Sequence, residues 1–124
     1  MIALFDKGDD AHGDCLAAIQ SFHGSLITTW PVLTEVFHFL DGPTERRALW
    51  DLIFRSALDV EAPLPNELQE IHRLMMKYAD LPMDFADASL VTVAQRRNIR
   101  RVLTLDSHFR AYRPRHVHSF EIFP

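Results

Sequence analysis

The chain reads Met83-Asp84-Phe85-Ala86-Asp87-Ala88 and, a helix length later, Val102-Leu103-Thr104-Leu105-Asp106. Apolar residues after Asp84 recur at helical spacing, which predicts a helix from about Asp84 to Arg97. The second stretch is a short apolar run, typical of a strand buried in a sheet. A helix followed at once by a buried strand is a unit of a parallel α/β sheet.

The rest of the chain alternates in the same way, with no repeat, low-complexity segment or linker in its sequence. We predict helices over residues 9–22, 31–40, 44–56 and 65–81, strands over 25–28 and 58–61, and a weakly alternating edge strand over 117–123. This order indicates the α/β class with a parallel sheet.

Composition limits the kinds of protein this can be. The chain has 124 residues, 48% apolar and 24% charged, which fits one soluble domain with a single core. Thirteen Lys and Arg against seventeen Asp and Glu give a net charge of −4, which argues against non-specific coating of nucleic acid but allows a local basic rim.

The sequence carries no sign of export or membrane insertion. No apolar run approaches the roughly 20 residues of a membrane helix, and Met1–Asp6 lacks the basic start of a signal peptide. We therefore expect a cytoplasmic protein without membrane contact. The single Cys15 excludes an intramolecular disulfide and a cysteine-based zinc site.

Four acids stand where acids are unexpected. Glu35 lies in a mostly apolar predicted helix, and Asp106 closes a strand. Asp84 and Asp87 are three residues apart at a helix start, so they point to about the same side. Burying an ionised carboxylate without a partner costs several kcal/mol. Because the carboxyl ends of parallel strands and the adjoining helix starts line one crevice, we expect these acids to meet there.

Acids that meet in this way indicate a cation. Neighbouring carboxylates raise each other's pKa unless a cation keeps them ionised. Oxygen ligands favour Mg²⁺ or Mn²⁺, which polarises a phosphoryl oxygen and supplies a hydroxide-like nucleophile. The pattern predicts metal-dependent phosphodiester hydrolysis, with four acids as both catalytic residues and metal ligands: Glu35, Asp84, Asp87 and Asp106.

Each acid also has a structural alternative. Asp84 fits a helix N-cap, and Asp106 fits the cap of a short final helix. Glu35 could instead form a buried ion pair with Arg46.

Three ordered stretches resemble the motifs of the PIN-domain family: Thr29-Trp30-Pro31-Val32-Leu33-Thr34-Glu35, Met83–Ala88 and Leu103-Thr104-Leu105-Asp106-Ser107-His108-Phe109. The resemblance covers nearly the whole chain and is closest to the short bacterial members that include VapC-type toxins. It implies a three-layer fold, with a short central parallel sheet flanked by helices. It also implies RNA cleavage with Mg²⁺ or Mn²⁺ held by acids.

The resemblance assigns roles residue by residue. Glu35, Asp87 and Asp106 match the acidic positions of the family, and Asp84 matches an acid often found just before. Thr104 matches the hydroxyl residue that precedes the last acid.

The start of the chain departs from the family pattern. Members normally begin with a short apolar strand that ends in Asp, followed by a segment that resembles Ile2–Asp9. Met1 starts inside that segment, so we expect a single domain over 1–124 that is N-terminally short, without the first strand and its acid. Two neighbouring strands would then hold unpaired backbone groups. Either the chain starts upstream, or another segment, including one from a second protomer, fills the place.

The leading prediction is a metal-dependent endoribonuclease of the PIN/VapC type. Its RNA substrate would contact Thr104, His108 and four clustered arginines: Arg96, Arg97, Arg100 and Arg101. The resemblance also implies a small antitoxin partner, and we expect a homodimer. The alternative is a catalytically degenerate PIN-fold module that binds a protein partner or RNA, since one acid is missing.

Several side chains have plainer interpretations. The arginine cluster is also typical of a solvated surface, and His108 of a surface imidazole. His116 and His118 alternate on a predicted strand, but two ligands are too few for a zinc site. Trp30 could stack a base, but its place at a strand-to-helix junction favours the core.

Overall fold

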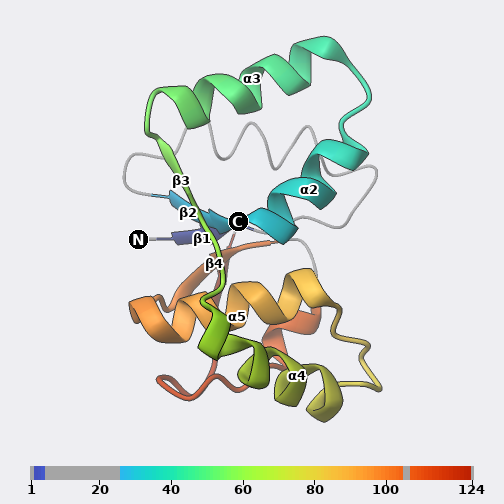
Figure 1. Cartoon of the computed structure of the whole chain (residues 1–124), viewed down its shortest axis with the longest axis vertical. Coiled ribbons are helices and arrows are strands. Elements are labelled where there is room, and N and C mark those ends of the chain that lie inside the picture. Colours follow the sequence, from blue (N-terminus) through green and yellow to red (C-terminus); the bar gives the residue numbers. More distant parts are fainter. Residues whose placement is uncertain (1, 5–25, 105–106, 124) are drawn as a thin grey trace.

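The computed structural model describes residues 2–4, 26–104 and 107–123, and within them a parallel sheet of five strands in the order β3-β2-β1-β4-β5 (Figure 1). The strands are β1 (Ile2–Leu4), β2 (Leu26–Thr29), β3 (Leu58–Glu61), β4 (Arg101–Leu103) and β5 (Glu121–Phe123). The predicted α/β class is confirmed, and β5 is the expected edge strand.

The centre of the sheet is formed by the first residues of the chain. β1 pairs in parallel with β2, with Ile2 opposite Leu26, and with β4, with Ala3 opposite Val102. The expectation that the central strand is absent was therefore wrong. Residues 2–4 satisfy the N–H and C=O groups that β2 and β4 would otherwise leave unpaired in the interior. The following residues 5–25, which include the predicted helix 9–22, lie outside the described part.

Helices cover both faces of the sheet. Figure 1 shows α2 (Trp30–Phe39) and α3 (Pro43–Phe54) on one side and α4 (Leu68–Lys77) and α5 (Phe85–Arg97) on the other. Short 3-10 turns occur at η2 (Pro65–Glu67) and η3 (Ser107–Arg110). None of these described helices is both long and apolar enough to cross a membrane.

The predicted helix bounds agree with the structure where local signals mark them. Pro43 opens α3, and Asn98 in the left-handed conformation (φ 54°) ends α5. The predicted helix 65–81 is shorter than expected, because a 3-10 turn takes its first residues and α4 ends at Lys77. His116 and His118 lie in a bend rather than on the predicted strand.

Two apolar clusters hold the layers together. The first joins α4, α5 and the C-terminal segment around Leu74, Val91 and Phe109. The second joins α2 and α3 to the sheet around Leu33, Leu49 and Leu58. Helix α5 is buried from Ala86 to Ala94, whereas α2 is less buried than its sequence predicts, with only its inner side in the cores.

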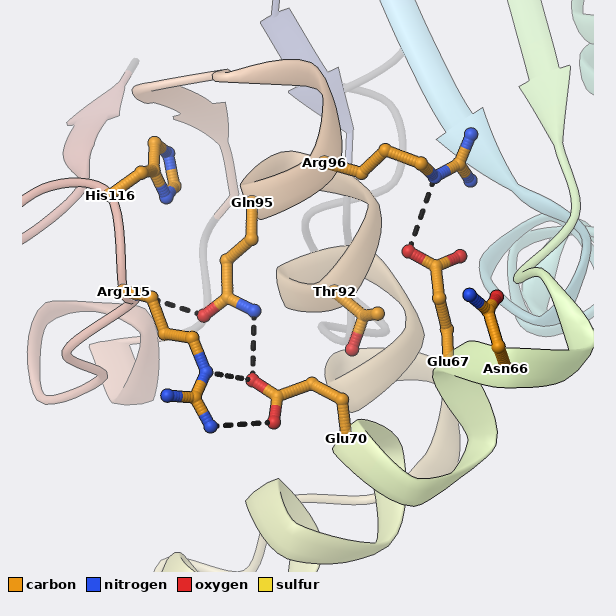
Figure 2. A pocket seen from close by; sticks show the side chains of 8 residues that line it. All are labelled: Asn66, Glu67, Glu70, Thr92, Gln95, Arg96, Arg115 and His116. Carbon is orange, nitrogen blue, oxygen red and sulfur yellow. Dashed lines mark hydrogen bonds and ion pairs between the residues drawn. The ribbon is translucent and has the colours of Figure 1, made fainter.

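An ion-pair network ties α4 to α5 and to the C-terminal segment (Figure 2). The Glu70 carboxylate accepts hydrogen bonds from Arg115 at 2.9 Å and from the Gln95 amide at 2.9 Å, as Figure 2 shows. It also accepts one from Arg73 at 2.6 Å. Glu70, Gln95 and Arg115 line a surface pocket of about 480 Å³. Hydrogen bonds from Arg73 and then Arg115 hold the pKa of Glu70 well below its usual value, although burial opposes them.

We expect this network to make the free energy of unfolding depend on pH. Because the folded state lowers the Glu70 pKa, the stabilisation is complete above the ordinary value of 4.5 and is lost as pH falls toward the lowered pKa. Glu70→Gln should flatten the acid limb of a plot of unfolding free energy against pH, measured by urea titration. Asp80→Asn, which removes an exposed carboxylate outside the network, is the control. An unchanged acid limb in Glu70→Gln would contradict the prediction.

Candidate functional site

The carboxyl end of β2 and the first turns of α2 and α5 meet at one edge of the sheet. Thr29 ends β2 and caps α2, since its hydroxyl accepts a hydrogen bond from the Val32 N–H at 3.4 Å. The same hydroxyl lies 2.8 Å from the Ser89 hydroxyl on α5. Ser89 donates its own proton to the Ala86 carbonyl at 2.7 Å, so Thr29 is the donor between the two. This chain of hydroxyls joins α2 to α5.

The two acids of α5 hold each other at its first turn. The Asp84 carboxylate accepts from the Asp87 N–H at 2.9 Å, and the Asp87 carboxylate accepts from the Asp84 N–H at 3.1 Å. This capping box confirms the N-cap interpretation of Asp84. Asp87 is fully buried, and the hydroxyl of Tyr112 approaches its Oδ2 to 3.5 Å.

The other predicted site residues are placed as follows. Glu35 lies on α2, half buried, with its Oε2 shielded from solvent. Thr104 follows β4 and is buried, and His108 is half buried on η3. Asp106 lies outside the described residues.

The acids of the described part do not complete a metal site by themselves. Within residues 2–4, 26–104 and 107–123, no three His, Cys, Asp or Glu side chains form a group that could hold a metal ion. The alternative interpretation of Glu35, an ion pair with Arg46, is not among the ion pairs of these described residues.

The predicted arginine cluster lies away from the acids. Helix α5 is about 20 Å long, with the acids at its start and Arg96 and Arg97 at its end. Arg96 pairs with Glu61 at 3.0 Å and with Glu67 at 3.2 Å, and Arg97 also pairs with Glu61.

The remaining two arginines, Arg100 and Arg101, lie at the amino ends of the strands, opposite the carboxyl ends where the acids are. Arg101 begins β4, whereas Thr104 follows its last residue, and Arg100 is exposed just before the strand. The structure therefore does not bring the four arginines to the acidic edge.

Sequence reasoning missed two features of this edge. The Thr29–Ser89 contact joins residues 60 positions apart. The sequence signal that was present, a Thr shortly before Pro31, indicates a helix cap at Thr29 but gives no sign of Ser89. The core interpretation of Trp30 was wrong, because 56% of this side chain is exposed.

Comparison with known proteins gives the class of the chain. Residues 1–113 match the family model of the PIN domain, so the chain belongs to the PIN-domain family. It is also similar to the protein named Ribonuclease VapC26 from Mycobacterium tuberculosis (strain ATCC 25618 / H37Rv). The two are 27% identical over 128 residues, an alignment that covers 100% of this chain and 95% of that protein.

The hydroxyl contact between α2 and α5 should contribute measurably to stability. Ser89→Ala removes the acceptor of the buried Thr29 hydroxyl, so we expect the free energy of unfolding to fall by about 1–3 kcal/mol. Thr92→Val is the matched control, because the buried Thr92 hydroxyl bonds to the Ala88 carbonyl of the same helix and reaches no second element. Urea denaturation measures both. Equal losses in the two variants would show that the contact between helices adds nothing.

Proposed function

We propose that this chain is a metal-dependent endoribonuclease of the PIN/VapC type, which hydrolyses phosphodiester bonds in RNA. The observation that carries the proposal is the complete burial of Asp87 at the start of α5. Helix starts at the carboxyl edge of a parallel sheet are where α/β proteins bind ligands. Burying an ionised carboxylate there costs free energy of folding, which a bound cation would offset. Membership of the PIN-domain family and the similarity to a protein named a ribonuclease support this choice.

The proposed cation is Mg²⁺ or Mn²⁺, held by Glu35, Asp84 and Asp87 together with Asp106. The donor chemistry fits, because carboxylate oxygens are the ligands that these ions prefer. Asp84 and Asp87 each use one carboxylate oxygen in the capping box, so a cation would be bound by the second oxygen of each. When bound, such an ion polarises a phosphoryl oxygen and activates water for attack on phosphorus.

The residues of the chain have their own tasks in this proposal. The capping box orients the two acids of α5, and the Thr29–Ser89 contact fixes the helix of Glu35 relative to them. Thr104 and His108 would contact the substrate. Contact of the arginines at 96, 97, 100 and 101 with an RNA backbone remains a proposal without support from their positions.

Cleavage of a mixed single-stranded RNA tests the proposal. We expect cutting in Mn²⁺, none in EDTA, and a loss of at least about 100-fold in Asp87→Asn, since one charged group at the reacting phosphate is removed. The Asn oxygen can still accept the Asp84 N–H, so the capping box and the fold should survive. Asp80→Asn, an exposed acid, is the control and should cut like the wild type. Cutting by Asp87→Asn at the wild-type rate would contradict the proposal.

The alternative function is a degenerate PIN-fold module that binds RNA or a protein. The two functions differ in how strongly the protein holds a cation.

Thermal unfolding separates the two functions. An intact site should be stabilised by Mn²⁺, by about 2.7 kcal/mol when the ion is at 100 times its Kd, and the melting temperature should rise accordingly. Asp87→Asn should lose this rise. Absence of any rise with Mn²⁺ or Mg²⁺, in a protein that still binds RNA in EDTA, would favour the binding module.

The partners follow from the same relationship. We propose RNA as substrate, a small antitoxin protein as inhibitor, a homodimer as the assembled form and the cytoplasm as the compartment.

A further inference from the structure

The two helices that carry acids each begin with an exposed aromatic residue. Trp30 is the first residue of α2 and 56% exposed, and Phe85 is the first residue of α5 and 45% exposed. Large aromatic side chains are mostly buried in folded proteins, and leaving them in water forgoes the gain from burial. Each follows directly on a capping residue, Thr29 and Asp84, so the backbone at both positions is held in place.

The hydroxyl contact between the helices brings these two positions to the same edge. The 2.8 Å contact joins Thr29, the residue before Trp30, to Ser89. Ser89 is four residues after Phe85, and residues four apart lie on one face of a helix, one turn from each other. Trp30 and Phe85 therefore both stand within about one helical turn of the Thr29–Ser89 contact.

The acids belong to the first two turns of the same two helices. Asp84 and Asp87 flank Phe85 in the first turn of α5, and their carboxylates are fixed there by the capping box. Glu35 lies on α2, about one and a half turns after Trp30. The two rings and the acids therefore belong to the same end of the sheet, where the proposed substrate binds.

The charge of the chain determines which ligand chemistry the rings fit. With a net charge of −4 and acids at this edge, the chain has little of the electrostatic attraction that usually dominates binding to nucleic acid. Aromatic rings attract nucleobases without charge, because every base has a π-face that stacks on them. Two rings beside the acids can supply the affinity that phosphate contacts do not.

We propose that Trp30 and Phe85 stack the bases of a single-stranded RNA on either side of the phosphate that reaches the acids. This inference rests on the proposed function and adds the surface that holds the substrate. Stacking of this kind tolerates any base, so the two rings give affinity and position rather than a sequence code.

The chain contains a matched pair of aromatics for comparison. Trp50 is 46% exposed and Phe54 75% exposed, both on α3, which carries none of the predicted acids. Their rings stack on each other, with centroids 5.4 Å apart and an angle of 21° between planes. The same residue types are therefore also exposed on a helix that carries none of the predicted acids.

Binding measured in EDTA tests the inference apart from cleavage. Fluorescence anisotropy gives the Kd for a short single-stranded RNA and for an abasic chain of the same length, which keeps the phosphates but lacks the bases. We expect the wild type to prefer the RNA with bases. Trp30→Ala and Phe85→Ala should each weaken RNA binding about 5- to 150-fold, and the double variant should lose the preference over the abasic chain.

Three controls define the outcome. Trp30→Phe should restore most of the affinity, since the ring is kept, and Trp50→Ala and Phe54→Ala should bind like the wild type. In Mn²⁺, Trp30→Ala should raise KM with a smaller change in kcat. Wild-type affinity in the double variant, or an equal loss in the α3 variants, would overturn the inference and leave the two rings as a contact for a protein partner.

The same measurements keep the two proposals apart. Cleavage that persists with unchanged KM in the double variant refutes base stacking and leaves the ribonuclease standing. Absence of cleavage in the wild type as well as in every variant refutes the ribonuclease. The ratio of the affinities for RNA and for the abasic chain then still confirms or overturns stacking.

Discussion

Helix α5 must lie in the interior over nine consecutive residues, and most of the structure follows from this constraint. A helix buried on all sides has no face for long polar side chains, so its turns carry Ala, Ser, Thr, Val and Leu. Its two interior hydroxyls bond to carbonyls of the preceding turn, and one of them also reaches Thr29. The rigid placement of α5 also fixes its first turn, where Asp84 and Asp87 cap the helix with their own carboxylates.

The capping box gives these two acids a structural and a proposed chemical task. A carboxylate at a helix start is favoured by the orphan N–H groups and the positive end of the helix. This offsets part of the cost of burying Asp87, so the acid can be kept in the interior. The same bonds restrict how it turns, which is what a ligand to a cation needs.

Much of the fold was predictable, because its signals are local. The helix starts at Pro31 and Asp84, the stop near Asn98 and the apolar runs of β2, β3 and β4 depend on neighbours in sequence. Family motifs added the position of the acids. The central strand was missed because Ile2–Asp9 resembles the segment that follows the first strand in the family, so Ile2–Leu4 was not taken for the strand itself.

Features that depend on distant residues were not predictable. The exposure of Trp30 depends on how distant segments pack around the start of α2. The ion pairs of Arg96 depend on Glu61 and Glu67, which lie beside the end of α5 in the fold. The clustering of arginines in the sequence does not indicate that Glu61 and Glu67 are the partners of Arg96. The acids gave a stronger signal than the arginines. An acid in an apolar stretch is unusual and needs a reason, whereas a run of arginines is ordinary on a solvated surface.

The position of β1 has a consequence for the order in which the fold forms. Ile2 pairs with Arg101, so β1 gains one of its two neighbours only when residues about 100 positions apart in the sequence come together. Contacts this far apart in sequence form slowly, because a long loop must close before they are gained. The middle of the sheet therefore closes late in folding, after the helices, whose contacts are local in sequence.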